Sequence, residues 1–407
     1  MSTFKVDVIK VTGITKHPNA DTLSIVQVFG QNCIFRTGEF NEGDLAVYVP
    51  YDSVVPLTDP KFSFLDKGKG AETMRIKPVR LRGEYSEGIL IKPQSGMKEG
   101  DDVAAILGII KYEEPEERVR AHHQGPKAAP AVKDPGIAPK YDMESFHRYG
   151  NSFQMGELVI ITEKIHGCNF RAVYHDGQLY VGSHNLFREA PREGNRPRAI
   201  TKGITSVLKN LRKDIHRSYA TPVLSEQGVY GYEDFSLKLM INNIRNRYLV
   251  TFNKEIKPVE ADTWWKMAIK YDLETKLKKN PDVVLYGEVY GNVQDLTYSV
   301  PEDESIRLAA FDLFDSKSKT YLDHDIAMNF CYDNEIPVVP ELYRGPLSKE
   351  IVEELTADFT KSYIDGKTMR EGIVIRPAEE RRDHNGRIVM KVVSRQYKSR
   401  NGGTEKH

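Results

Sequence analysis

A segment rich in proline and alanine divides the chain into two parts of unequal length. Its sequence, EEPEERVRAHHQGPKAAPAVKDPGIAPK at residues 113–140, contains few large apolar side chains. Such a composition cannot build a core, because it buries too little apolar surface to offset the entropy lost on ordering. The sequence therefore predicts a linker at 113–140, with one domain at 1–112 and a second at 141–407.

The N-terminal part has the pattern of a small β-barrel. Short runs rich in Val, Ile, Phe and Tyr, separated by Gly, Asn, Pro or Asp, occupy residues 4–14, 23–30, 32–38 and 45–55. Residues 77–93 continue this pattern. Closely spaced β runs of this kind are typical of barrels, and a five-stranded OB-type barrel fits them.

The C-terminal part mixes strands with helices in no regular alternation, which predicts an α+β fold. Runs with strand character occupy residues 157–167, 170–184, 283–291, 306–315, 371–377 and 387–394. Residues 261–279 predict a helix with Asp262 or Thr263 as its N-cap. Residues 347–359 predict another, with Ile351, Leu355 and Phe359 on one face.

Bulk composition excludes several classes of protein. Lys plus Arg and Asp plus Glu both number 58, so any binding of nucleic acid must come from local patches. No stretch is apolar enough for a membrane span, and the first residues lack the apolar core of a signal peptide. Cys33, Cys168 and Cys331 are far apart and form no CxxC pair. A reducing, cytoplasmic location and no membrane partner are therefore predicted.

Six short motifs follow one another along the second part of the chain. They are EKIHG (163–167), VGSHNLFRE (181–189), LYGEVYG (285–291), LAAFDLFD (308–315), EGIVIRP (371–377) and MKVVSRQYK (390–398). Each alone has an ordinary explanation, such as a solvated lysine at a strand end or a common strand entry. Their occurrence together in this order is much harder to attribute to chance.

This ordered set resembles the covalent nucleotidyltransferase superfamily, which contains RNA ligases, DNA ligases and mRNA capping enzymes. EKIHGCN at 163–169 is similar to the first motif of double-strand-type RNA ligases. KHPNADTLSIVQV (16–28) and KPVRLRGEYSEGIL (77–90) resemble the N-terminal OB domain that one RNA ligase family carries. The resemblance implies an OB-like β-barrel joined by a linker to a nucleotidyltransferase domain of antiparallel sheets and helices.

The resemblance also implies an ATP-dependent reaction with Mg²⁺ or Mn²⁺. The neutral amine of Lys164 would attack the α-phosphorus of ATP and form a lysyl-AMP adduct. His166 would orient a phosphate or the nick, Glu371 would hold metal, partly through water, and Lys391 would lie near the α-phosphate. Lys164, His166, Glu371 and Lys391 are thus the expected catalytic residues.

Other motif residues are expected to bind nucleotide or RNA. Gly167 would let the chain turn closely past the nucleotide. Glu288 would bond a ribose hydroxyl, and Phe311 would stack on adenine. Asn169 would assist at the 3′ end of the nick. For Asn169 and Phe311, a turn cap and a core phenylalanine are strong competing explanations.

Two departures from the family pattern concern phosphate contacts. Related ligases usually carry a Ser-Arg pair after the first motif, whereas this chain has Ser183 and His184. Two alternatives follow: Arg188 supplies the missing phosphate contact, or His184 weakens that contact. The last motif often contains K-x-K, but here two valines follow Lys391, which leaves Lys398 and Arg395 as candidate substitutes that strand geometry does not guarantee.

The expected partner is RNA with 3′-hydroxyl and 5′-phosphate ends, as in a nicked duplex, bound by a monomer. Residues 196–217 and 387–400 are rich in Lys and Arg and predict phosphate contacts. Arg80 and Arg82 of the OB-like part are further candidates for RNA binding.

Two other functions remain open from the sequence. One is an RNA-binding protein that uses its OB domain and carries a lapsed ligase domain. The other is a DNA ligase or a capping-type enzyme. Members of those last two groups normally carry their OB domain after the catalytic domain, whereas the β-rich part comes first in this chain.

Overall fold

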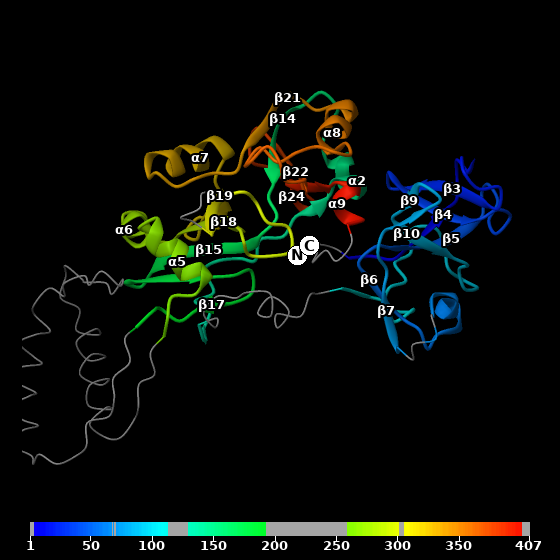
Figure 1. Cartoon of the computed structure of the whole chain (residues 1–407), viewed down its shortest axis with the longest axis horizontal. Helices are drawn as coiled ribbons and strands as arrows, with labels where there is room; N and C mark the ends of the chain where they lie inside the picture. The colour runs from blue at the N-terminus through cyan, green and yellow to red at the C-terminus, as the bar shows by residue number, and fades with distance from the viewer. Residues whose placement is uncertain are drawn as a thin grey trace, which may run out of the picture.

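A computed structural model describes residues 4–66, 68, 71–112, 129–192, 259–300 and 305–400. Figure 1 shows the N-terminal strands, coloured blue to cyan, grouped beside the larger part, coloured green to red. Most of the predicted linker lies outside the described residues, so the domain limits at 112 and 140 stay a prediction. No helix in the described part has the length and apolarity needed to cross a membrane.

The N-terminal part is built from short antiparallel strands, as the sequence predicts. Its described elements are β1 (Asp7–Lys10), β2 (Thr15–Lys16), β3 (Leu23–Val28), β4 (Gln31–Arg36), β5 (Leu45–Pro50), β6 (Ser53–Pro56), η1 (Pro60–Leu65), β7 (Thr73–Arg75), β8 (Val79–Leu81), β9 (Glu84–Ser86), β10 (Gly88–Ile91) and β11 (Ile110–Lys111). They pair in the orders β1-β5-β10, β2-β3-β4, β11-β6-β7 and β8-β9.

Strand β5 holds two hydrophobic clusters together, because successive side chains of a strand point to opposite faces. Val47 and Val49 pack into one cluster with Val8 and Phe62. Ala46 and Tyr48 pack into the other, with Phe35 and Val26. Phe35 and Tyr48 are therefore core residues of the barrel and do not form an exposed platform for bases.

Two sheets form the larger part. Among the described residues, one sheet has the order β12-β17-β16-β15-β18-β19-β20 and the other the order β13-β25-β22-β14-β21. The strands of the first are β12 (Ala131–Val132), β15 (Cys168–His175), β16 (Gln178–Gly182), β17 (Phe187–Arg188), β18 (Val283–Gly291), β19 (Ile306–Asp315) and β20 (Thr320–Tyr321). Those of the second are β13 (Glu144–Ser145), β14 (Leu158–Lys164), β21 (Glu341–Pro346), β22 (Gly372–Pro377) and β25 (Met390–Val393). A small hairpin, β23 (Arg382–Asp383) and β24 (Gly386–Arg387), lies between β22 and β25 in the chain.

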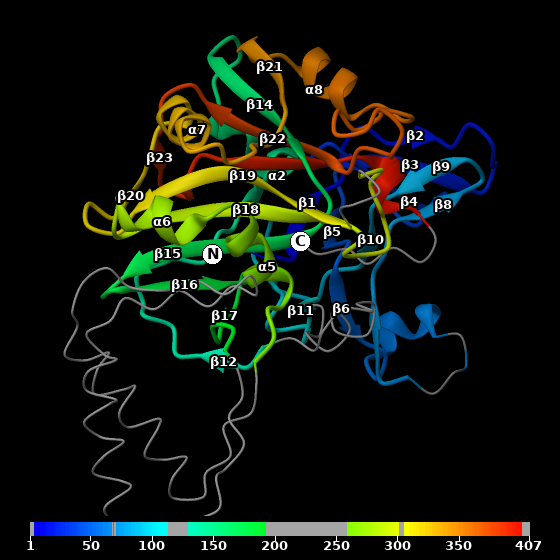
Figure 2. The same ribbon diagram turned by 60° about the vertical axis from the view of Figure 1, so that its left-hand side comes forward.

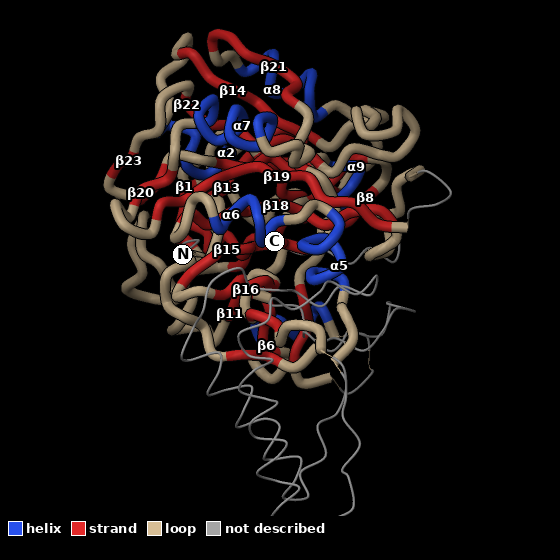
Figure 3. Tube along the Cα trace, turned by 90° about the vertical axis from the view of Figure 1, so that its left-hand side faces the viewer, coloured by secondary structure: helices blue, strands red, loops and turns tan. Residues whose placement is uncertain are grey.

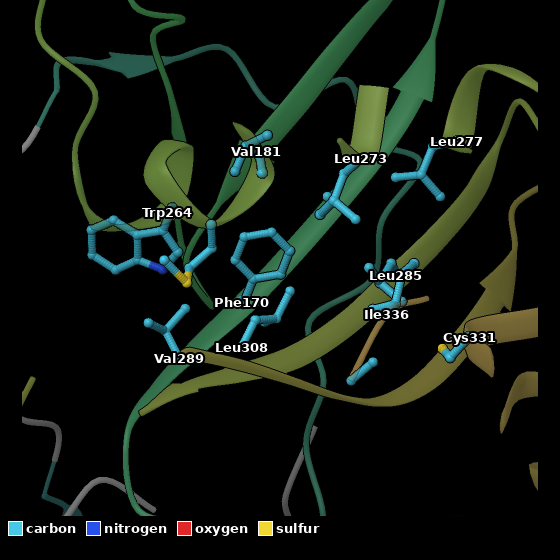
Figure 4. Close-up of a cluster of buried hydrophobic side chains, with 14 of the residues drawn as sticks. Phe170, Val181, Trp264, Leu273, Leu277, Leu285, Val289, Leu308, Cys331 and Ile336 are labelled. Atoms are coloured by element: carbon cyan, nitrogen blue, oxygen red, sulfur yellow. The ribbon is translucent and has the colours of Figure 1, made fainter. Parts of the chain in front are cut away.

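Helices cover the outer face of the first sheet. Figure 3 shows α5 (Thr263–Lys270), α6 (Leu273–Lys278) and α7 (His324–Asp333) on one side of β15, β18 and β19. Their apolar side chains join those of the sheet in the cluster drawn in Figure 4, where Trp264 and Leu273 face Phe170 and Leu285. Sequence reasoning did not find α7.

The predicted helix at 261–279 forms as two helices. Asp262 is the N-cap, and its carboxylate accepts a hydrogen bond from the backbone N–H of Trp265. Asp272 has a positive φ of 48°, a left-handed conformation that cannot continue a right-handed helix. The chain therefore stops α5 and starts α6 at this point.

The second sheet is covered by α8 (Lys349–Thr356) and by the short helix α2 (Phe146–Tyr149), which precedes the 3₁₀ turn η2 (Gly150–Ser152). Ile351 and Leu355 of α8 pack on the sheet, as predicted. The prediction for Phe359 was wrong: it lies beyond the helix, is 77 % exposed and has a φ of 69°.

The uncovered faces of the two sheets lie toward each other (Figure 2). Asp312 of β19 is fully buried between them. It accepts hydrogen bonds from Tyr141 (2.6 Å), from Arg387 of β24 (2.7 Å) and from Arg376 of β22 (3.4 Å). The two arginines hold the pKa of this carboxyl below its usual range although burial acts in the opposite direction. This charge cluster fastens the second sheet to the first.

Replacing Phe170 by alanine tests the outer core of the first sheet. Phe170 is completely buried, so Phe170→Ala should lower the free energy of unfolding by about 3–5 kcal/mol through lost burial and the cavity left behind. Phe64→Ala is the matched control, because Phe64 is 64 % exposed. Urea unfolding followed by tryptophan fluorescence measures both. Equal losses for the two variants would contradict this account of the core.

Candidate active site

Lys164 is the last residue of β14 and points toward the space between the two sheets. Val159 and Ile161 of the same strand pack in the hydrophobic cluster between the second sheet and α8, here called the outer cluster. Because successive side chains of a strand point to opposite faces, Thr162 and Lys164 point to the inner face. Strand β14 pairs with β22 in a register that places Lys164 opposite Gly372. The Lys164 ammonium consequently donates a hydrogen bond to the carboxylate of Glu371.

Two glycines allow the backbone to pass closely at this site. A Cβ at Gly372 would lie 2.1 Å from the carbonyl oxygen of Val392, and one at Gly167 would lie 2.2 Å from that of Val289. Neither backbone neighbour can move aside without breaking a strand. Gly167 therefore holds the turn after Lys164 against β18, which carries Glu288.

Strands β15 and β18 bring a carboxylate and an amide to the same inner face. Their register pairs Asn169 with Glu288, and the space beside Gly167 is bounded by the Glu288 side chain. The Oδ1 atom of Asn169 is buried and has no hydrogen-bond partner among the described residues. A buried acceptor of this kind fits a ligand that brings its own donor, such as a hydroxyl group.

Lys391 adds a second cation from strand β25. It pairs with Val374 of β22 and shares its inner face, since Met390 and Val392 pack into the outer cluster. Burial lowers the pKa of Lys391 to about 8, and the nearby ammonium groups of Lys164 and Lys111 act in the same direction. An anion bound next to Lys391 would raise its pKa again, because it stabilises the charged ammonium.

His166 is buried, and both ring nitrogens and its backbone N–H have hydrogen-bond partners. Its Nδ1 lies 2.6 Å from the hydroxyl of Tyr397, its Nε2 lies 3.1 Å from Oδ1 of Asp295, and its backbone N–H donates to the hydroxyl of Tyr298 at 2.8 Å. Nδ1 also lies 3.8 Å from Oε2 of Glu371. His166 is thus fixed next to the Lys164–Glu371 pair.

Sequence reasoning missed the three partners of His166. Tyr397 stands inside the last motif stretch, directly before Lys398, so its position was a usable signal. Asp295 and Tyr298 follow β18 in a loop that has no motif of its own. Only the folded chain shows that this loop returns to the turn after Lys164.

Phe311 lies between two hydrophobic clusters and is partly buried. Its ring centroid is 4.8 Å from that of Tyr141 in an edge-to-face contact. The structure therefore gives Phe311 a packing role, and stacking on a base stays a prediction.

Arg188 is placed away from the inner face. Its guanidinium lies 4.9 Å from the ring centroid of Trp264 and donates to the carbonyl of Ala129 at 3.4 Å. Phe187, the preceding residue, packs with Tyr141 and Tyr286 on the inner face of the first sheet, so Arg188 points to the opposite face, which α5 covers. This placement does not bring Arg188 to Lys164, because adjacent residues of a strand face opposite ways.

The other departures have structural consequences as well. Lys398 and Arg395 do not replace the absent lysine of the last motif, because both reach Glu87, at 2.8 Å and 3.4 Å. His184 lies 3.8 Å from the Asp142 carboxylate, and burial lowers its pKa.

The candidate RNA contacts are only partly described. Arg80 and Arg82 are exposed at the β8–β9 hairpin, where Arg80 lies over the ring of Tyr85. Residues 196–217 lie outside the described residues. Of 387–400, Arg387, Arg395 and Lys398 are bound to carboxylates and are not free phosphate contacts.

Two protein-family models match separate parts of the chain. Residues 240–393 match the RNA ligase family model, and residues 5–93 match an OB-fold domain model. A stretch similar to RNA ligases thus follows a stretch similar to an OB-fold domain. The first match begins after Lys164, so it includes Glu288, Glu371 and Lys391 but not the first motif. No curated protein matches the chain.

Solved structures match over nearly the whole length. A lysine-to-alanine variant of Naegleria gruberi RNA ligase with ATP and Mn is 18 % identical, with 97 % of this chain and 98 % of that chain covered and a TM-score of 0.67. The same ligase with PPi gives the same values. A lysine-to-methionine variant with AMP and Mn is 19 % identical, with 97 % of each chain covered and a TM-score of 0.66. The predicted fold, an α+β domain behind an OB barrel, is confirmed.

The lowered pKa of Lys391 predicts a pH-dependent stability. Between its folded pKa of about 8 and its ordinary 10.5, the unfolded chain binds more protons than the folded one, so the contribution of this residue rises with pH. Relative to Lys391→Met, the unfolding free energy of the wild type should increase by about 1–3 kcal/mol from about pH 7 to 10. Urea unfolding of both proteins without nucleotide measures this. A difference that does not change with pH would contradict it.

Proposed function

We propose that the protein is an ATP-dependent RNA ligase that joins 5′-phosphate and 3′-hydroxyl ends. The observation that carries the proposal is the contact of Lys164 with Glu371, near the second cation Lys391, on the inner face of the second sheet in a fold similar to that of an RNA ligase. A lysine nucleophile, a carboxylate and a cation are the groups that transfer of a nucleotide onto an amine requires.

In the first step, Nζ of Lys164 attacks the α-phosphorus of ATP. The N–P bond forms, the bond to the β-phosphate oxygen breaks, and pyrophosphate leaves. The amine must lose its proton before it attacks, and the Glu371 carboxylate lies within hydrogen-bond reach to accept it. Lys391 would offset negative charge on the α-phosphate.

The nucleoside would lie along strands β15 and β18. Glu288 would accept a hydrogen bond from a ribose hydroxyl, and Gly167 would leave room for the nucleotide beside the turn. Phe311 would face the base. The orphaned Oδ1 of Asn169 would accept a hydrogen bond from a hydroxyl, which suits a role at the 3′ end of the nick.

A divalent metal fits this site only in company with phosphates. No cluster of three or more His, Cys, Asp and Glu side chains able to hold a metal occurs among the described residues. Mg²⁺ and Mn²⁺ can be held by one or two carboxylates, phosphate oxygens and water, so Glu371 would contribute partly through water. The metal would offset charge on the leaving pyrophosphate.

Two further steps complete the joining. AMP moves from Lys164 to a 5′-phosphate and forms a 5′–5′ pyrophosphate, which the 3′-hydroxyl of the neighbouring strand attacks with release of AMP. A nicked duplex is the proposed substrate, with Arg80 and Arg82 as phosphate contacts. We also propose a monomer in a cytoplasmic compartment, which suits three free, buried cysteines.

Intact-mass analysis with ATP and Mg²⁺ or Mn²⁺ tests the function. The wild type should gain one AMP, and Lys164→Ala should gain none because it has no nucleophile. Lys361→Ala is the control, since Lys361 is exposed and outside the site. Sealing of a nicked RNA duplex should be lost with Lys164 as well.

Several outcomes would overturn this reading. Transfer from GTP alone would favour a capping-type enzyme, and a preference for nicked DNA would favour a DNA ligase. No adduct with ATP, GTP or NAD⁺, from protein first treated with pyrophosphate to remove bound AMP, would favour an RNA-binding protein with a lapsed ligase domain.

The variant Arg188→Met tests whether the Arg188 side chain contacts a phosphate of the nucleotide or only packs on Trp264. Because Arg188 lies on Trp264, the variant should lower the free energy of unfolding by about 1–2 kcal/mol. It should still transfer AMP to Lys164 at close to the wild-type rate. Thermal melting and intact mass give the two readouts, and a loss of adduct formation in a fully folded variant would restore Arg188 to the nucleotide site.

A further inference from the structure

The short helix α9 (Arg395–Lys398) lies at the contact between the N-terminal barrel and the active site. Two of its side chains, Arg395 and Lys398, are three residues apart and reach Glu87 of the barrel at 3.4 Å and 2.8 Å. Residues at this spacing lie on one face of a helix. One face of α9 is therefore tied to the N-terminal part.

Tyr397 and Arg400 face the active site. The hydroxyl of Tyr397 contacts Nδ1 of His166 at 2.6 Å. Arg400 stacks on the Tyr397 ring at 3.5 Å and binds Asp295, the partner of His166 Nε2, at 3.0 Å. Both hydrogen bonds of the His166 ring thus depend on residues in or directly after α9.

The start of α9 is attached to Glu371, the residue directly before β22. Ser394 caps the helix by accepting from the N–H of Tyr397 at 3.2 Å, and its own N–H donates to the carbonyl of Glu371 at 2.8 Å. Glu87 and Lys398 are buried almost completely, at 2 % and 1 % side-chain exposure. A charge pair shielded from water in this way holds its geometry closely, because separating it leaves either charge unpaired.

These contacts determine how the His166 ring is held. Asp295 as a carboxylate only accepts, so Nε2 carries a proton, and in a neutral ring Nδ1 accepts from the Tyr397 hydroxyl. Among the described residues, Glu371 and Tyr298 also contact His166, while Lys164 and Arg400 bind its neighbours Glu371 and Asp295.

We propose that Tyr397 is a positioning residue for His166, and that Glu87 of the N-terminal barrel acts through Lys398 to keep Tyr397 in place. Docking of the barrel would then be coupled to the geometry of the site. The inference rests on the proposed ligase function, although its structural part can be tested without any reaction.

The chemical test uses sealing of a nicked RNA duplex that already carries AMP on its 5′ end. At saturating RNA, Tyr397→Phe should slow sealing about 10-fold, the effect of one lost hydrogen bond, and leave the KM for RNA close to wild type. Glu87→Gln should cause a loss no larger than this. Combining the two should give no further loss, because both act on the same contact.

Asp7→Asn is the matched control. Asp7 binds Arg148 of α2, so it also joins the barrel to the larger part, and its ion pair in the described part of the chain is with α2 and not with a residue of α9. It should leave sealing unchanged. Glu87→Gln leaves the charge of Lys398 buried without its counter-charge, which can prevent folding. If that variant does not fold, the double variant Glu87→Gln with Lys398→Met, which removes both charges, is used instead.

The structural test is the ¹⁵N NMR spectrum of the His166 ring at about pH 8, assigned with His166→Gln. Tyr397→Phe and Glu87→Gln should both shift the Nδ1 resonance toward that of a nitrogen without a donor, and Asp7→Asn should not. The proposal would be overturned if the losses in sealing rate of Glu87→Gln and Tyr397→Phe multiplied in the double variant. It would also be overturned if Asp7→Asn sealed as slowly as these variants, or if the Nδ1 resonance did not shift in them. A wild type that forms no AMP adduct would defeat the ligase function alone.

Discussion

The antiparallel pairing of β14 with β22 is the constraint on which the site depends. It places Lys164 opposite Gly372 and hence beside Glu371, although the two charged residues are far apart in the chain. The approach requires a glycine, since a Cβ at 372 would collide with the Val392 carbonyl. A β ladder fixes such positions more firmly than a loop would, because each backbone hydrogen bond helps to set the register.

The space between the two sheets is maintained by charge as well as by packing. Asp312, with Tyr141, Arg376 and Arg387, joins the sheets at a fully buried point. Lys164 and Lys391 of the second sheet and Glu288 of the first lie on these inner faces, near further buried polar side chains such as Thr162 and Arg376. Polar groups held in this way can act on a ligand without reorganising, which is the property that stabilises developing charge most effectively.

The N-terminal barrel is attached to the larger part by buried and half-buried ion pairs rather than by apolar contact alone. Asp7 binds Arg148, and Glu87 binds Lys398. Pairs of this type add little net stability, because removing the charges from water offsets their attraction, but they specify one relative arrangement. Helix α9 connects that arrangement with His166, which lies next to the nucleophile.

The sequence by itself determined the β-rich N-terminal part, the α+β character of the rest and the order of the motif residues, because strand periodicity and motif spacing are local properties. It also offered Asp262 or Thr263 as a helix cap and placed Ile351, Leu355 and Phe359 on one helix face, of which Asp262, Ile351 and Leu355 are confirmed. Only the tertiary structure decided that Arg188 packs on Trp264, that Lys398 is bound to Glu87, and that Asp295, Tyr298 and Tyr397 surround His166. Those contacts join segments that are distant in the chain. The direction of a side chain at such a contact depends on strand register and on which strands pair, and the local sequence pattern does not encode either.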